Sequence, residues 1–180
     1  MSNREICEKS AVELAADIRA KRLSPVEVTD AVLGRIEQLN PTLNAICIEM
    51  PDEARHSARE AEAAVMRGDE LGPLHGVPVS IKDLIHQKGT RITFGSKLFA
   101  DNIAQQDSPV VERLRQAGAV CIGRTNTPEF GWKGVTDNLL FGITRNPWQT
   151  ELTPGGSSGG AAAAVAAGMG PVAIGSDGGG

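Results

Sequence analysis

A glycine- and serine-rich segment followed by an alanine-rich run constrains this chain more than any other feature. Residues 155–160 read Gly-Gly-Ser-Ser-Gly-Gly, and a run of mostly alanine continues to Gly168. Glycine adopts backbone conformations that other residues avoid, and it lets another group approach closely. Alanine is the strongest helix former, and the N–H groups at the start of such a helix would face Ser157 and Ser158. The segment predicts a tight turn that presents hydroxyl groups suited to polarising a carbonyl or relaying a proton.

The second half of the chain alternates predicted strands with predicted helices. Short β-branched or apolar strands are expected at Val77–Ile85, Ala119–Gly123 and Pro171–Gly175, and Ser108-Pro109 opens a helix that ends at Gly118. Continuous apolar strands that alternate with helices are typical of a parallel sheet buried on both faces. The pattern therefore predicts the α/β class.

The first third reads as helical. Helices are expected from Ser10 to about Lys21, from Ser24 to about Leu39, and from about Asp52 to Arg67. The second has the clearest start, with a serine cap, proline at the first helical position and glutamate three residues after the serine. We expect Asn40-Pro41 to end it. This region shows no chemistry and could serve packing or a homo-oligomer surface.

Composition excludes several classes of function. The net charge of −4 and the 3% aromatic content provide neither a basic surface nor stacking platforms for nucleic acid. The start of the chain lacks a signal-peptide pattern, and no apolar run reaches the roughly 20 residues of a membrane span. Cys7, Cys47 and Cys121 are odd in number and widely spaced, which favours free thiols in a reducing compartment. A soluble cytoplasmic protein is expected.

Lys82 is the most unusual charged residue because it lies among Ile81, Leu84 and Ile85 in a predicted strand. Strand alternation places Ser80 and Lys82 on the same face. Burial disfavours the charged form of lysine and lowers its pKa, so that the neutral amine can act as a base. The alternative is a strand-end lysine with its ammonium group in water, which is the common situation for lysine.

Four sequence blocks, in order, resemble the amidase signature family. They are Pro73–Leu84, Gly123–Phe130, Phe141–Trp148, and the segment from Gly155 that ends in Ala-Ile-Gly-Ser-Asp-Gly-Gly-Gly at 173–180. The resemblance implies an α/β/α fold with a mixed central sheet covered by helices, of which only the N-terminal portion would be present. It implies a helical region packing on the core at residues 1–70 and the truncated α/β core at 71–180.

The resemblance also implies roles for particular residues. Lys82 matches the family's catalytic lysine, and Ser157 matches a bridging serine whose preceding peptide bond, Gly156–Ser157, is cis. Ser158 would be a supporting hydrogen-bond donor or acceptor near the substrate carbonyl. The implied reaction is hydrolysis of a small linear carboxylic amide by acyl transfer to serine, without a cofactor or metal. His56, His75 and His86 lack both a serine partner in a recognisable motif and metal-ligand spacing.

The nucleophile itself falls outside this sequence. The family pattern is Gly-Thr-Asp-x-Gly-Gly-Ser, whereas this chain reads Gly-Ser-Asp-Gly-Gly-Gly from Gly175 and stops at Gly180. The nucleophilic serine would be the next residue. Ser176 precedes the aspartate, so it is expected to be a hydrogen-bonding strand residue and not a substitute. Backbone N–H groups of Gly178, Gly179 and Gly180 would hold the oxyanion.

Three other functions stay open. Residues 155–159 fit the G-x-S-x-G nucleophile elbow of α/β-hydrolases, although the preceding residues make a poor strand and no histidine follows His86. The chain could be a non-catalytic fragment. It could also belong to the amidase subunit of a glutamyl- or aspartyl-tRNA amidotransferase, which releases ammonia from glutamine for a partner.

The 180-residue polypeptide is expected not to hydrolyse amides by itself, because the attacking hydroxyl is absent from it. Ammonia release from simple amides and labelling by a serine-directed fluorophosphonate check this expectation. Turnover above background, or labelling of Ser157, would contradict it.

Overall fold

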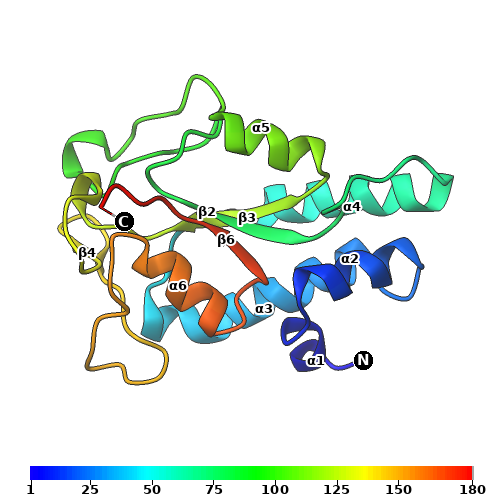
Figure 1. Ribbon diagram of the computed structural model, residues 1–180, viewed down its shortest axis with the longest axis horizontal. Coiled ribbons are helices and arrows are strands. Elements are labelled where there is room, and N and C mark those ends of the chain that lie inside the picture. Colours follow the sequence, from blue (N-terminus) through cyan, green and yellow to red (C-terminus); the bar gives the residue numbers. More distant parts are fainter. Residues whose placement is uncertain (180) are drawn as a thin grey trace.

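A four-stranded mixed sheet organises the chain (Figure 1), and the computed structural model describes residues 1–179. In chain order the elements are α1 (Asn3–Cys7), α2 (Ala11–Arg19), α3 (Pro25–Leu43), β1 (Ile46–Glu49), α4 (Pro51–Arg67), β2 (Pro78–Lys82), η1 (Lys97–Phe99), α5 (Pro109–Gln116), β3 (Val120–Thr125), η2 (Glu129–Gly131), β4 (Asp137–Asn138), β5 (Gly142–Ile143), α6 (Gly159–Ala166) and β6 (Val172–Ile174).

The sheet has the order β1-β3-β2-β6, in which β3, β2 and β6 are parallel and β1 runs antiparallel to β3. Helix α5 lies on one side of the sheet, and α3 and α6 lie on the other (Figure 1). All five residues of β2 are buried, as expected for an inner strand covered on both faces. The predicted α/β class is therefore confirmed, and so is the parallel pairing of the strands flanking α5.

The helices begin where their sequences indicate. Serine side chains at positions 2, 10 and 24 cap α1, α2 and α3, each in a capping box with a glutamate three residues later. Each box satisfies backbone N–H groups that have no partner within the helix. The inner faces of α3 and α6 then pack with β3 in one apolar cluster, which includes Val32, Ile36, Ile122 and Ala163.

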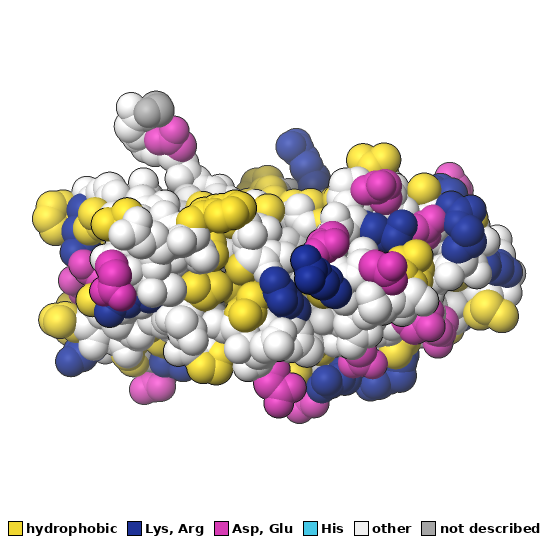
Figure 2. Space-filling view, turned by 90° about the horizontal axis from the view of Figure 1, so that it is seen from below, with side chains coloured by type: hydrophobic (Ala, Val, Ile, Leu, Met, Phe, Trp, Pro, Cys, Tyr) yellow, Lys and Arg dark blue, Asp and Glu magenta, His cyan; other side chains and the backbone are white. Residues whose placement is uncertain are grey.

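The surface carries charges of both signs. Figure 2 shows that Lys, Arg, Asp and Glu side chains are most frequent from the middle of this face to the end where the N-terminal helices lie, and that hydrophobic side chains gather in the other half. Positive and negative groups lie beside one another there, so this face has no large area of a single sign. Within residues 1–179, no helix has both the length and the apolar character needed to cross a membrane.

The predicted end of α3 at Asn40-Pro41 is wrong, because the helix continues to Leu43. A proline in the last turn removes only one backbone donor, and the helix tolerates that loss. The buried Asn40 side chain accepts from the N–H groups of Ala45 and Ile46 and donates to the carbonyl of Ile46. Asn44 then ends the helix with a left-handed φ of 49°.

Three strand predictions also need correction. The first third is not helical throughout, since Ile46–Glu49 forms β1 on the antiparallel edge of the sheet. Strand β2 stops at Lys82 and does not reach Ile85. Strand β6 is half-buried where a buried strand was expected, because only β2 pairs with it and it forms the other edge of the described sheet.

Helix α6 packs against the backbone that follows β3. A Cβ atom on Gly160 would lie 2.4 Å from the nitrogen and 2.5 Å from the oxygen of Asn126. The N–H of Gly160 donates to that same oxygen at 3.2 Å. A side chain at residue 160 would push away the start of α6, and with it Ser157 and Ser158.

Gly160→Ala is expected to lower the free energy of unfolding by about 1–3 kcal/mol through overpacking against rigid backbone. Gly34→Ala is the matched control, because Gly34 is an exposed glycine in α3 at which an added Cβ would have no atom within 4 Å. The control should gain about 0.5–1 kcal/mol from helix propensity. Urea denaturation of both variants measures the difference, and equal stabilities would contradict the packing argument.

Candidate active site

Lys82 ends β2 with a fully buried side chain. Its Nζ lies 2.7 Å from Ser157 Oγ, 2.9 Å from Ser158 Oγ and 3.0 Å from Ser176 Oγ. These serines come from the loop before α6 and from the segment after β6. The structure therefore brings together Lys82, Ser157 and Ser158, which the sequence singled out, and adds Ser176.

The loop that carries the serines depends on glycine and on Thr136. The Gly156–Ser157 peptide bond is cis, as the family resemblance implied. A Cβ atom on Gly156 would lie 2.8–2.9 Å from the backbone of Val135, so only glycine fits there. Thr136 Oγ1 donates to the carbonyl of Gly155 at 2.8 Å and accepts from the N–H of Gly159 at 3.1 Å. Sequence reasoning missed Thr136, which connects both ends of the loop.

The hydroxyl of Ser158 is committed to hydrogen bonds that hold Ser176. Its proton goes to the Ser176 carbonyl at 3.1 Å, and its oxygen accepts from the Ser176 N–H at 3.1 Å. The one remaining lone pair faces Lys82, so Ser158 accepts from the lysine. Ser158 is therefore a positioning group and an acceptor, and it has no free proton to give to the amine.

Ser157 differs from Ser158 because Lys82 is the partner that the structure gives its hydroxyl. A neutral lysine amine has one lone pair and two N–H groups. The lone pair can accept the Ser157 proton while the two N–H groups donate to Ser158 and Ser176. Three hydroxyls around Nζ fit a neutral amine in this way, and they fit the three N–H donors of an ammonium group equally well, so the protonation state depends on the surroundings.

The surroundings favour that neutral form. Desolvation by burial lowers the pKa of Lys82 from 10.5 to about 8, and the nearby charge of Asp177 opposes the shift. Ser158 is also the N-cap residue of α6, so the positive end of the helix dipole lies beside the amine. A positive end repels an ammonium group and tolerates an amine. At neutral to mildly alkaline pH a useful fraction of Lys82 is therefore a free base.

Two of the three glycines expected to hold an oxyanion lie on the exposed segment after β6. Gly178 and Gly179 are exposed, and the Gly179 N–H donates to Asp177 Oδ1 at 2.9 Å. Gly180 lies outside the described residues. The oxyanion role of these glycines stays a prediction. Ser176 was expected to be a strand residue, yet it follows β6 and contacts Lys82 directly.

The described side-chain contacts of His75 and His56 lie outside the serine cluster. His75 Nε2 hydrogen bonds with the Ala61 carbonyl at 2.9 Å, which is a packing contact, and the exposed His56 lies beside Glu60. Residues 144–158 contain no strand, which contradicts the strand-turn-helix geometry of an α/β-hydrolase elbow at Ser157. Among residues 1–179, no three His, Cys, Asp or Glu side chains gather as metal ligands would.

Comparison with known proteins finds similarity to the amidase family. A sequence model of the Amidase family matches residues 27–180. An acylamidase of Rhodococcus erythropolis is 49% identical over 94% of this chain and 35% of its own length. A glutamyl-tRNA(Gln) amidotransferase subunit of Acidothermus cellulolyticus is 46% identical over 98% of this chain and 35% of its own.

A solved structure of a bacterial aryl acylamidase of the amidase signature family superposes with a TM-score of 0.88 at 39% identity, covering 92% of this chain and 34% of that protein. The chain thus spans about a third of the length of the relatives that it matches.

Lys82 is expected to make stability depend on pH in a defined window. Below pH 8 the amine is protonated in both states, and desolvation of the buried ammonium destabilises the fold. Between pH 8 and 10.5 the folded state has lost a proton that the unfolded state keeps, so the free energy of unfolding rises with pH.

The measurement is urea denaturation of wild type and of Lys82→Met from pH 7 to 11. The free energy of unfolding of wild type minus that of Lys82→Met should increase between pH 8 and 10.5. Lys88 is exposed, so the control variant Lys88→Met should show the same pH profile as wild type. Parallel pH profiles for wild type and Lys82→Met would count against a depressed lysine pKa.

Proposed function

Because this chain belongs to the amidase signature family, we propose that it carries the lysine–serine part of the proton relay of an amide hydrolase. Lys82 is the base, Ser157 is the bridging serine, and Ser158 holds the segment that contains Ser176. The observation that carries the proposal is the 2.7 Å contact between Lys82 Nζ and Ser157 Oγ, made by a fully buried lysine.

The proposed relay moves one proton at a time. The lone pair of Lys82 takes the proton of Ser157, and Ser157 takes the proton of the nucleophilic serine, which in the family pattern follows Gly180. That serine oxygen attacks the amide carbonyl, and the C–N bond then breaks to leave an acyl-enzyme. The leaving amine takes its proton back along the same path from the Lys82 ammonium. Water releases the acid in a second round.

Histidine is unnecessary in this scheme because Lys82, with its lowered pKa, acts as the general base, as the imidazole of histidine does in Ser-His-Asp triads. The peptide N–H groups of Gly178, Gly179 and Gly180 are proposed to stabilise the oxyanion. Removal of one donor from such a set typically costs roughly 3–4 kcal/mol of transition-state stabilisation. No cofactor takes part.

The proposed substrate is a small linear carboxylic amide. Support comes from the acylamidase and aryl acylamidase relatives, which act on amide bonds by name. We place the protein in the cytoplasm, since its three cysteines are free thiols, as in a reducing compartment.

A second candidate function is the amidase subunit of a tRNA-dependent amidotransferase. The observation that favours it is the 46% identity with the Acidothermus cellulolyticus amidotransferase protein over 98% of the chain. That function requires a tRNA-binding partner and glutamine as the ammonia source. Stable co-purification with such a partner, together with strict preference for glutamine over other amides, would support it against the stand-alone amidase.

Lys82→Met is expected to lower kcat for amide hydrolysis by the complete gene product by about 10²–10⁴-fold, because the relay loses its base. Ser157→Ala should cost a similar factor, since the proton path is cut between amine and nucleophile. Lys88→Met, an exposed lysine six residues away, is the control and should retain wild-type activity.

Ammonia release from aliphatic and aryl amides measures these effects. A Lys82→Met protein within tenfold of wild type would remove the lysine from the mechanism. Loss of activity in Lys88→Met would show that the effect is not specific to the site.

A further inference from the structure

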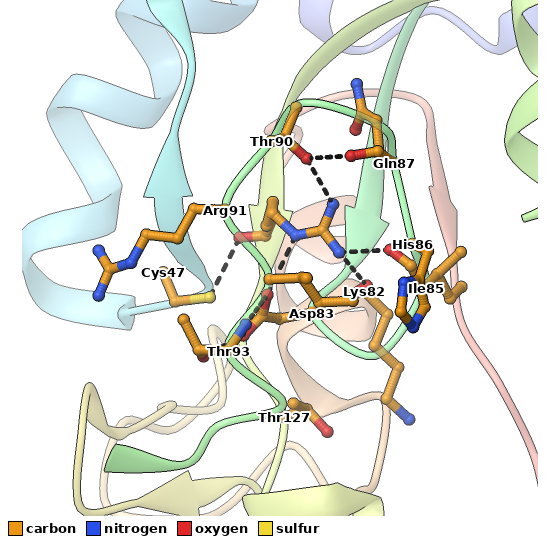
Figure 3. Close-up of polar contacts among 12 residues, drawn as sticks. Cys47, Lys82, Asp83, Ile85, His86, Gln87, Thr90, Arg91, Thr93 and Thr127 are labelled. Carbon is orange, nitrogen blue, oxygen red and sulfur yellow. Dashed lines mark hydrogen bonds and ion pairs between the residues drawn. The ribbon is translucent and has the colours of Figure 1, made fainter. Parts of the chain in front are cut away.

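The residue that follows Lys82, Asp83, forms a buried ion pair with Arg124. Asp83 and Arg124 are both fully buried, and Arg124 Nε donates to Asp83 Oδ1 at 3.0 Å. Arg124 belongs to β3, in which its neighbour Thr125 is paired in register with Lys82. Figure 3 shows the polar contacts that surround the pair.

The guanidinium group binds the main chain on both sides of the turn that follows Lys82. Arg124 Nη2 donates to the carbonyl oxygen of Lys82 at 3.2 Å and also to that of Ile85. Nη1 donates to Thr90 Oγ1 at 3.4 Å. One rigid, planar group therefore ties the carbonyl of the lysine itself to the next turn of the chain.

The carboxylate of Asp83 is held just as fully from the opposite side. It accepts from the N–H of Thr93 at 3.2 Å, from the Thr93 hydroxyl, and from the N–H of Gly95 at 3.4 Å. The backbone N–H of Asp83 also donates to the carbonyl of Thr125 at 3.1 Å, and its carbonyl accepts from the N–H of Phe94 at 3.1 Å. Both partners of the pair are thus anchored to β3 and to the 93–95 segment.

Stability alone is a weak explanation for this arrangement. Removing two charges from water costs about as much as their attraction returns, and apolar replacements of buried pairs are often neutral or stabilising. What an apolar pair could not do is grip two carbonyl oxygens around Lys82. Placement matters at such a site, because an error of about 1 Å in a catalytic group can cost 10²-fold in rate.

We propose that the Arg124–Asp83 pair is a positioning device that fixes the backbone of Lys82, so that Nζ stays buried among the three serine hydroxyls. Arg124 and Asp83 act through Lys82, and the described hydrogen bonds of the pair include none of these three serines. This inference rests on the proposed function, since it assigns the pair a task only if Lys82 is the base.

Arg124→Lys tests the proposal because it preserves the charge but removes the planar fork. An ammonium group cannot reach Asp83 and both carbonyls with the same geometry. A looser Lys82 would admit water to its amine. The midpoint of Lys82 titration should then rise from about 8 toward 10.5, by about one pH unit. Because the charge is unchanged, a field effect of Arg124 would not produce this rise.

The measurement is the pH dependence of the Lys82 13Cε and 15Nζ chemical shifts in protein labelled with 13C,15N-lysine, assigned with Lys82→Met. Arg55→Lys is the matched control, because Arg55 makes a 2.8 Å pair with Asp30 on the exposed surface. Its Lys82 midpoint should equal that of wild type. A purely structural pair would lower the melting temperature of Arg124→Lys and leave the midpoint unmoved.

Thr93→Val is measured alongside, since it removes one donor to Asp83 while preserving the shape of the side chain. This variant should also raise the Lys82 midpoint, by a smaller amount. If Arg124→Lys no longer melts cooperatively, the Lys82 midpoint of Thr93→Val tests the proposal in its place. A wild-type midpoint near 8 with unchanged midpoints in the folded variants overturns this inference alone. A wild-type midpoint near 10.5 overturns the proposed base as well.

Discussion

The burial of one amine among hydroxyl groups is the constraint around which the rest of this structure is arranged. A buried ammonium is costly, and three serine hydroxyls surround Lys82 Nζ. Desolvation and the start of α6 favour the neutral amine, and the nearby charge of Asp177 opposes them. Holding the amine in that place requires three chain segments, which end β2, precede α6 and follow β6, to meet at one point.

Each of those segments is fixed by a different physical device. The loop before α6 is pressed against the backbone of Val135 at Gly156 and is tied at both ends by Thr136. The segment after β6 is held through both backbone groups of Ser176 by a single hydroxyl, that of Ser158. The end of β2 has the buried Arg124–Asp83 pair behind it. Hydrogen bonds, with glycine where contacts are closest, do most of this work near the site, whereas apolar packing governs the helices.

Sequence reasoning reached the local features because local physics produces them. Serine caps, a proline at the first helical position and glycine stops located the helices, and the family motifs located Lys82 and Ser157. It failed where contacts outside the helix or strand itself decided the outcome. Helix α3 continues through Pro41, and the Asn40 side chain binds the backbone five and six residues further on. Strand β1 has four residues and is recognised by its pairing with β3. Arg124 lay just beyond the predicted strand Ala119–Gly123 and received no role, since nothing nearby in sequence reveals its carboxylate partner 41 residues away.

By itself the sequence determined that this is an α/β chain. It has a lysine in a buried strand, and a turn with two adjacent serines precedes an alanine-rich helix. Propensity, periodicity and motif spacing are properties of short segments, so they can be read without coordinates. Only the tertiary structure decided which serine keeps its proton available and which spends it on the backbone. That distinction depends on hydrogen bonds between segments 18 to 94 residues apart, which exist only once the sheet has assembled.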